Sequence, residues 1–151
     1  MLVLGPWAGR ERGDVSGGGK RLVGRVIEVT DGDTVVVRLE SGEVERVRYI
    51  GVDTPESTSE PVECFGGRAA VANRRLVGGT VVSLEPGVER RDDYGRLLAY
   101  VRRGEMLVNA ELVRRGLARS LTIAPNDARA GLFEGLEQGA ARSGTGLWGL
   151  C

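Results

Sequence analysis

The strongest constraint on the fold is an alternation of apolar and polar residues from Leu22 to Ile50, which two glycine turns interrupt. A period of two predicts strands, because successive side chains of a strand point to opposite faces. The turns, Asp31-Gly32 and Ser41-Gly42, divide this stretch into three strands over 22–29, 34–39 and 44–50. We therefore expect a three-stranded meander at the start of the folded region.

A helix and two more strands should follow the meander. The helix is indicated by apolar residues at helical spacing that end at Gly78-Gly79: Phe65, Ala69, Ala72 and Leu76. Two further strands are expected over 80–84 and 96–101. Five strands with a helix between the third and the fourth is the order of an OB barrel, a fold that commonly binds nucleic acid. We predict an α+β fold, mainly β, built as a five-stranded OB barrel with about three helices.

Two short patterns predict the remaining helices. Asn109 can cap a short helix that ends at Gly116, and Pro125-Asn126-Asp127 can open a last helix. That last helix carries three glycines four residues apart, each of which costs about 1 kcal/mol relative to alanine: Gly131, Gly135 and Gly139. Their spacing places them along one side of the helix, where another backbone could approach closely.

Length and composition limit the class of protein. The chain has 151 residues, which suits one domain; we expect a flexible tail over 1–20 and a single domain over 21–151. The 21 basic and 21 acidic residues cancel, so any affinity for phosphate must be local. The chain has no histidine. This excludes Ser-His, Cys-His and His-metal schemes and leaves carboxylates as candidate general bases.

The cysteines and the compartment leave two interpretations open. Cys64 and Cys151 could be two free thiols of a cytosolic chain, or a disulfide that anchors the C-terminal tail, which we favour. A bridge across so long a loop would contribute about 4 kcal/mol in the chain-entropy model. No apolar stretch reaches the length of a membrane-spanning helix, and the first residues lack the pattern of a signal peptide, so a soluble chain is expected.

Three short motifs carry the chemistry: Thr30-Asp31-Gly32-Asp33-Thr34, Arg48 to Glu56 with Asp53-Thr54-Pro55, and Asp92-Asp93-Tyr94-Gly95-Arg96. Each motif alone is better explained as a turn. The first is not an EF-hand, because Gly42 stands where a bidentate Glu is needed. Together, however, they group carboxylates with arginines, as metal-assisted attack on a phosphate diester requires. Arg48 and Asp53 would point to opposite faces of a regular strand, so we expect a bulge or strand end near Gly51.

These motifs, together with the segment Val108 to Val113, resemble the thermonuclease family, whose type member is staphylococcal nuclease. The resemblance extends from about Leu22 to Cys151. It implies an OB-fold, calcium-dependent phosphodiesterase that cuts DNA and RNA and leaves 3′-phosphate ends. By this resemblance, calcium would be ligated by the carboxylates of Asp33 and Asp53 and by the carbonyl of Thr54.

The same resemblance assigns the other site residues. Arg48 and Arg96 would hold the scissile phosphate, and Glu56 would orient or deprotonate the attacking water. Asp92 and Tyr94 would help to bind substrate. Relatives that carry a cysteine pair like that of this chain favour the disulfide and an extracytoplasmic or secreted location, although no export signal is present.

The chain departs from the family pattern before Pro125, where the type member has tyrosines that flank the nucleotide base. Here the segment is Leu121, Thr122, Ile123 and Ala124. Loss of base stacking could cost about 1 to 3 kcal/mol per base, so chemistry can persist while affinity falls.

The rival function is a noncatalytic OB module that binds nucleic acid without cutting it; a structural domain for a protein partner is a weaker rival. The full set of acids and arginines favours the enzyme. Nucleic acid is the expected partner, with no membrane and no obligate protein partner, and we expect a monomer.

Overall fold

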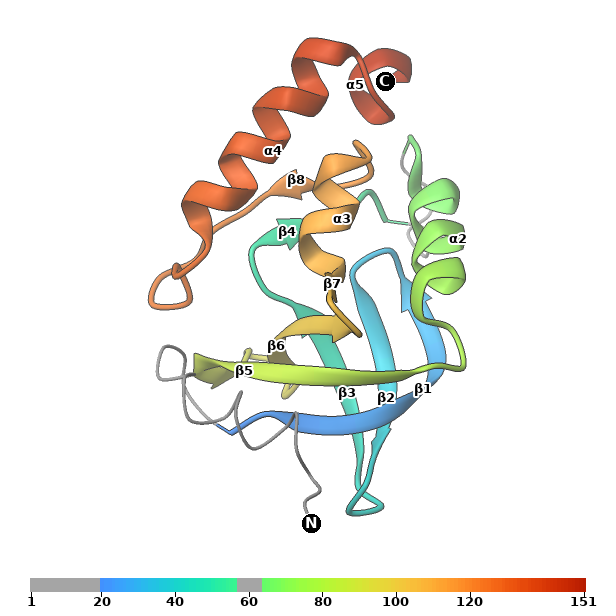
Figure 1. Cartoon of the computed structure of the whole chain (residues 1–151), viewed down its shortest axis with the longest axis vertical. Coiled ribbons are helices and arrows are strands. Elements are labelled where there is room, and N and C mark those ends of the chain that lie inside the picture. The colour runs from blue at the N-terminus through green and yellow to red at the C-terminus, as the bar shows by residue number, and fades with distance from the viewer. Residues whose placement is uncertain (1–19, 57–63) are drawn as a thin grey trace.

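The computed structural model describes residues 20–56 and 64–151 (Figure 1). The predicted tail over 1–20, except Lys20, therefore lies outside the described residues. Five long strands form the body of the fold: β1 (Leu22–Asp31), β2 (Thr34–Leu39), β3 (Val44–Tyr49), β5 (Val81–Arg91) and β6 (Leu97–Arg103). They lie in the order β3-β2-β1-β5-β6, and β6 pairs with β3 again. The sheet is thus closed, and the predicted OB barrel is confirmed.

The barrel closes through its one parallel pairing among the described strands. Antiparallel ladders join β1 to β2 and β5, β2 to β3, and β5 to β6. In contrast, β3 and β6 run parallel, with Val47 opposite Leu97 and Tyr49 opposite Ala99. The β1 ladder also shifts register at two points towards Asp31, which bends this strand around the barrel.

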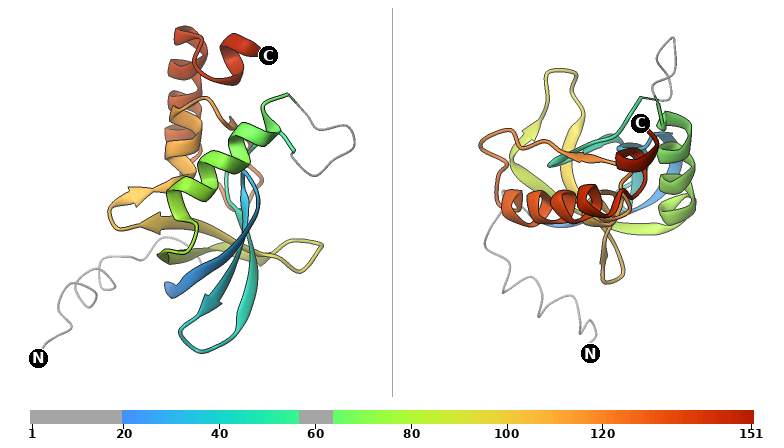
Figure 2. Two further views of the ribbon diagram at one scale, coloured as in Figure 1. Left: turned by 90° about the vertical axis from the view of Figure 1, so that its right-hand side faces the viewer. Right: turned by 90° about the horizontal axis from the view of Figure 1, so that it is seen from above.

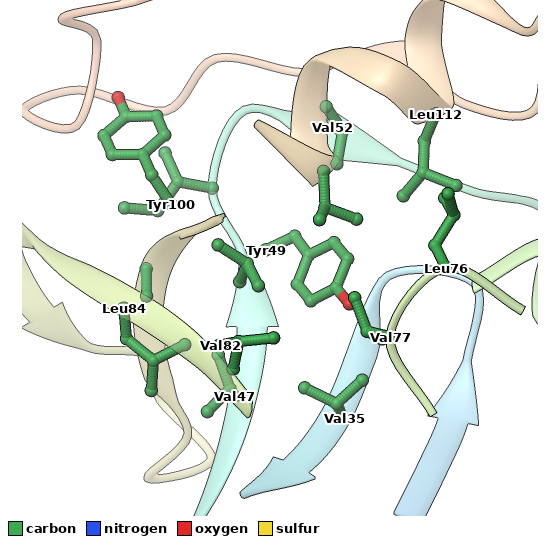
Figure 3. Packing of buried hydrophobic residues seen from close by; sticks show 14 of the residues in the cluster. Val35, Val47, Tyr49, Val52, Leu76, Val77, Val82, Leu84, Tyr100 and Leu112 are labelled. Carbon is green, nitrogen blue, oxygen red and sulfur yellow. The ribbon is translucent and has the colours of Figure 1, made fainter. Parts of the chain in front are cut away.

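The barrel interior is filled by the alternating residues of the predicted strands. Val35 and Val37 of β2 and Val47 of β3 are fully buried, as are Leu84 of β5 and Val101 of β6. Figure 3 shows part of this cluster, in which the ring of Tyr49 lies among aliphatic side chains from strands and helices. In β1 to β3, burial on one face explains why the period of two predicted these strands. β5 differs from the prediction over 80–84, because it continues to Arg91 and buries consecutive residues from Val82 to Gly87.

The helices lie at one end and one side of the barrel (Figures 1 and 2). They are α2 (Gly66–Val77), α3 (Val108–Arg114), α4 (Ala130–Ser143) and α5 (Leu147–Leu150), and three two-residue strands accompany them: β4 (Val52–Asp53), β7 (Met106–Leu107) and β8 (Arg119–Ser120). In Figure 1, α3 lies over the upper end of the barrel, α2 beside β1, and α4 along the outside of α3. Within the two described segments, no helix has both the length and the apolar character needed to span a bilayer.

Two predicted helix starts are wrong because the asparagines have other partners. α3 begins at Val108, and Asn109 is fully buried inside it. Its side chain accepts the Val101 N–H at 2.8 Å and donates to the Ile50 carbonyl at 2.8 Å, which joins β6 to the turn after β3. α4 begins at Ala130, downstream of the predicted start at Pro125-Asn126-Asp127.

Asn126 holds the preceding loop against β5. Its side chain accepts the Glu89 N–H and donates to the Glu89 carbonyl, both at 2.9 Å. Asn126 therefore bonds to a strand that lies 37 residues away in the sequence, and it does not cap the helix that follows it.

The glycines of α4 were expected to allow close approach of another backbone, and the described chain shows none. A Cβ at Gly131, Gly135 or Gly139 would meet no atom within 4 Å. The tight contact lies nearby, between Gly116 after α3 and Gly146 before α5. A Cβ on either glycine would overlap the backbone beside the other, and the Leu147 N–H donates to the Gly116 carbonyl at 2.9 Å.

The C-terminus is joined to the start of α2. The sulfur atoms of Cys64 and Cys151 are bonded, with their Cα atoms 6.2 Å apart. This is the pairing that we favoured from the sequence, and it ties α5 to the segment that precedes α2.

Candidate active site

The turn between β1 and β2 carries two buried carboxylates, Asp31 and Asp33, and Asp33 contacts the other site residues. Asp33 is 6% exposed, and its Oδ1 accepts the Thr34 hydroxyl at 2.9 Å while its Oδ2 accepts the Thr54 N–H at 2.9 Å. Gly32 is required beside it, because a Cβ there would overlap Thr54 and Ala69. The sequence signal Asp-Gly-Asp therefore reflects both a tight turn and close packing against α2.

The same turn is held from inside the barrel by a tyrosine and an asparagine. The Tyr49 N–H donates to the Asp33 carbonyl at 2.9 Å. The Tyr49 hydroxyl donates to Asn73 Oδ1 at 2.7 Å, and Asn73 Nδ2 donates to the Asp31 carbonyl at 2.9 Å. Burial raises the pKa of Tyr49 well above its ordinary value, and the hydrogen bond to Asn73 offsets this only in part. Tyr49 therefore remains a neutral donor, and both ends of the turn are fixed.

Arg48 lies between two carboxylates at the end of β3. Its Nη1 donates to the carbonyls of Tyr49 and Val52 at 2.8 and 2.7 Å. Its Nη2 lies 3.4 Å from Asp33 Oδ2 and 3.2 Å from Asp53 Oδ1. The spacing difficulty is resolved as predicted: β3 ends at Tyr49, Gly51 takes a φ of 82°, and Asp53 follows in β4.

The second arginine lies on the turn between β5 and β6. Asp92 Oδ1 accepts the N–H groups of Tyr94 and Arg96, and its Oδ2 accepts Arg96 Nε at 2.7 Å. Burial alone would raise the pKa of Asp92, but these N–H donors and the Arg96 guanidinium bring it below its ordinary value. Asp92 is therefore an anion that orients Arg96. No bond of an Arg96 Nη group to another described residue is observed, so its outer edge faces outward for a ligand.

A cleft of about 320 Å³ joins the two arginines to the segment after β8. Arg48 and Arg96 line one part of it, and Leu121 and Ile123 line another. Tyr94, which is 74% exposed and lies under the Arg96 guanidinium, is at its rim. The cleft therefore places guanidinium groups next to an apolar wall. Aliphatic side chains form this wall at positions where the resemblance to the thermonuclease family implies tyrosines.

The structure brings most of the predicted site residues together. Asp33, Arg48, Asp53 and Thr54 are joined by the contacts above, and Asp92, Tyr94 and Arg96 form the second group across the cleft. Glu56 is exposed and follows β4 at the end of the first described segment. Sequence reasoning missed Tyr49 and Asn73, since they lie 24 residues apart and no local motif joins them.

The oxygen donors at this place suit a hard cation. Asp33 and Asp53 approach the same Nη2 of Arg48, so their carboxylates converge on one point. Thr54 lies beside them, 4% exposed, and its Oγ1 is buried without a hydrogen-bond partner among the described residues. In 20–56 and 64–151, no three His, Cys, Asp or Glu side chains converge as a metal site. Two carboxylates would thus need a carbonyl, water or substrate oxygen to complete a calcium shell.

A closed OB barrel that gathers two carboxylates around Arg48, beside a cleft lined by Arg48 and Arg96, fits a hydrolase of the nuclease class. Residues 46–149 match the family described as staphylococcal nuclease homologue, and the chain belongs to that family. The chain is 40% identical over 129 residues to a protein named thermonuclease from Staphylococcus intermedius, an alignment that covers 84% of this chain and 74% of that protein.

Two further relatives agree with this assignment. A thermonuclease from Staphylococcus hyicus is 36% identical over 126 residues, with 82% of this chain and 74% of that protein covered. Endonuclease YncB from Bacillus subtilis (strain 168) is 38% identical over 135 residues, with 85% and 63% covered.

Proposed function

We propose that this chain is a calcium-dependent nuclease that hydrolyses DNA and RNA and leaves 3′-phosphate ends. One observation carries the proposal: Arg48 Nη2 lies 3.4 and 3.2 Å from carboxylate oxygens of Asp33 and Asp53. A cation-binding pair of acids and a phosphate-binding arginine are thus assembled at one point. The thermonuclease and endonuclease names of the relatives support the same chemistry.

The proposed roles follow from the contacts. Asp33, Asp53 and the Thr54 carbonyl would hold the ion, and calcium, when bound, would offset the negative charge that develops on the phosphoryl oxygens. Arg96 would grip the scissile phosphate through its Nη groups, because a guanidinium can donate two parallel hydrogen bonds to phosphate oxygens. Arg48 would contact the same phosphate through Nη2 once its two carboxylate partners bind the ion. Asp92 already holds Arg96 by Nε, which keeps the Nη groups for substrate.

Glu56 would complete the reaction as the group that handles water. It would accept a proton from water as the water oxygen forms its bond to phosphorus. The bond from phosphorus to the 5′ oxygen then breaks, the leaving 5′ oxygen takes up a proton from solvent water, and the phosphate remains on the 3′ side. Its exposed position after β4 is compatible with access to solvent water.

The aliphatic wall of the cleft should affect binding more than chemistry. Leu121 and Ile123 can contact a nucleotide base, but they lack the aromatic faces on which bases stack. We therefore propose weak binding of single nucleotides with retained cleavage of polynucleotides. A noncatalytic OB module would not need both carboxylates, both arginines and Glu56, which is why the enzyme is preferred.

Three further properties belong to the proposal. The chain acts as a monomer, it resides in an extracytoplasmic or secreted location, and its Cys64–Cys151 bridge forms there. The bonded pair in the structure supports the last two properties, since disulfides persist in oxidising compartments.

The direct test is cleavage of single-stranded DNA and RNA in calcium and in chelator. We expect fragments with 3′-phosphate ends in calcium, none in chelator, and recovery when calcium is restored. Asp33→Ala and Asp53→Ala should each abolish most cleavage, while Glu40→Ala, which changes an exposed acid of the β2–β3 turn, serves as the control. Undiminished cleavage in chelator would exclude the metal mechanism.

A further inference from the structure

The outer face of α2 carries three arginines, Arg68, Arg74 and Arg75, which we name the α2 arginine face. The helix has no acidic residue, and its other side is buried against the barrel through residues such as Ala69, Asn73 and Leu76. All three arginines are exposed. In Figure 2 (left), α2 crosses the front of the barrel.

Among the residues that the structure describes, no acid neutralises the charges of this face. Other arginines of the chain have carboxylate partners, such as Arg91 with Glu45 at 2.6 Å and Arg129 with Glu85 at 3.0 Å. Within 20–56 and 64–151, no ion pair is observed for Arg68, Arg74 or Arg75. In a chain with zero net charge, this is a local concentration of positive charge.

Two more arginines extend the cluster at the end of the helix. Arg25 donates to the Gly79 carbonyl at 2.7 Å, and Arg103 donates to the Leu76 carbonyl at 2.9 Å. Cations at a helix C-terminus are favoured by the helix dipole, which explains why arginines lie at this end of α2. The dipole does not explain Arg68, because this residue lies in the first turn of α2, where the dipole disfavours a cation.

The surface between the arginines is hollow. Gly67, Arg68, Val71, Ala72 and Arg75 line a shallow depression of about 490 Å³. Arg68 and Arg75 are two turns apart on the same side of the helix, a rise of about 10.5 Å. Small side chains between two guanidiniums leave room for an extended ligand that presents negative groups at intervals.

The helix that carries the α2 arginine face also packs on the candidate active site. The buried side of the same helix contacts the turn that carries Asp33: Asn73 donates to the Asp31 carbonyl, and Ala69 packs against Gly32. Arg68 is the neighbour of Ala69 in the helix. A polymer bound at Asp33 and Arg48 could therefore reach this face by crossing one helix.

We propose that the α2 arginine face binds the phosphodiester backbone of the polynucleotide beyond the scissile bond. The inference rests on the proposed nuclease function, and it extends the substrate contact to a second surface. A nucleic acid strand supplies regularly spaced phosphates, which arginine forks bind well, and the neutral net charge leaves such local clusters as the source of attraction. The face would compensate for the weak base contacts at Leu121 and Ile123.

The test compares Arg68→Ala/Arg75→Ala with the matched control Lys20→Ala/Arg142→Ala, which removes two exposed charges elsewhere. With long single-stranded DNA, we expect KM to rise about tenfold at unchanged kcat for the first variant only. Cleavage of a chromogenic mononucleotide diester should be unchanged in both. Binding of a fluorescent long oligonucleotide in chelator should weaken in parallel, and its log–log salt slope should fall by about 1.4, or about 0.7 for each lost contact.

The outcomes separate this inference from the proposed function. If the parent cleaves no nucleic acid in calcium, the nuclease proposal fails, and the binding measurement in chelator still tests the face. If the parent cleaves and Arg68→Ala/Arg75→Ala has the same KM as the parent on long single-stranded DNA, the inference is wrong. An equal loss in the control variant, or binding to phosphatidylglycerol vesicles without binding to the oligonucleotide, would also overturn it. Circular dichroism spectra of each variant provide the check on folding.

Discussion

At the scale of single residues, Arg48 shows why the site depends on a guanidinium. It donates to two backbone carbonyls with one nitrogen and faces two carboxylates with the other. A lysine has one nitrogen and could satisfy only part of this set. Arg96 shows the same division, since its Nε is bound by Asp92 and its outer edge faces the cleft.

We therefore expect Arg48→Lys and Arg96→Lys each to lower kcat about a hundredfold or more with little loss of stability. The control is Arg38→Lys, an exposed arginine of β2. Turnover of single-stranded DNA at saturating calcium measures the effect. Parental turnover in either site variant would show that the arginine is only a surface charge.

Tyr49 leads to a second prediction at this scale, because its hydroxyl acts on the Asp33 turn through Asn73. Tyr49→Phe should raise the calcium concentration for half-saturation several-fold and lower stability by about 1 kcal/mol, the usual net value of one hydrogen bond. Tyr100→Phe is the matched control, since Tyr100 is also buried but does not contact this turn. Calorimetry of calcium binding distinguishes a role in positioning the Asp33 turn from a role in stability alone. Equal calcium affinities in Tyr49→Phe and Tyr100→Phe would show that Tyr49 contributes only to stability.

At the scale of elements, the strands could be predicted from the sequence, but the hydrogen-bond partners of the asparagines could not. The first three strands were predictable because they bury roughly every second side chain, which is a local pattern. In contrast, β5 buries consecutive residues from Val82 to Gly87, and its end at Arg91 was not predicted. Asn109 and Asn126 carry helix-start signals, yet their amides bind backbone groups of distant strands. The motifs predicted which site residues gather, because turns place them near strand ends. The Tyr49–Asn73 link could not be predicted, because it depends on how α2 packs on the barrel.

The C-terminal end of α3 provides a pH prediction. Hydrogen bonds from Arg114, opposed by burial and aided by Arg115, lower the pKa of Glu111 to about 2. A carboxylate with a lowered folded-state pKa stabilises the protein above its unfolded pKa of about 4.3, and this contribution is lost as the pH falls towards 2. The arginine partners are 60% and 44% exposed, so the contribution should stay below about 1 kcal/mol.

Glu111→Gln should therefore reduce stability at pH 6 and reduce the slope of stability between about pH 5 and pH 2. Denaturant unfolding at a series of pH values measures this slope. Glu105→Gln, at an exposed turn before β7, should leave the slope unchanged. An identical acid slope in Glu111→Gln and the parent would show that solvent screens the cluster fully.

At the scale of the whole molecule, the Cys64–Cys151 bridge connects the C-terminal helices to the start of α2 across 87 residues. In the chain-entropy model, a bridge that closes a loop of this length stabilises the folded state by about 4 to 5 kcal/mol. Because the bridge joins segments outside the barrel, the positions of Asp33, Arg48 and Arg96 do not depend on it directly.

Reductant should therefore lower the melting temperature by many degrees while cleavage at 25 °C remains close to that of the oxidised protein. Thermal unfolding with and without reductant, followed by nonreducing peptide mapping, provides the measurement. Cys64→Ser/Cys151→Ser should melt like the reduced protein and show no response to reductant. Two free thiols in protein purified under oxidising conditions would contradict both the bridge and the proposed extracytoplasmic location.

The parallel pairing of β3 with β6 also determines when the site can form during synthesis. Arg48 lies opposite Leu98, and Tyr49 opposite Ala99, so β3 has no partner on this edge until residue 99 has left the ribosome. Domains fold from the N-terminus as they emerge, but this ladder joins segments about fifty residues apart, and Arg96 emerges only with the second of them. Until then, a nascent chain carries Asp33 and Arg48 without Arg96, to which we assign a share in binding phosphate. The proposed site therefore stays incomplete until both strands of this ladder have been synthesised.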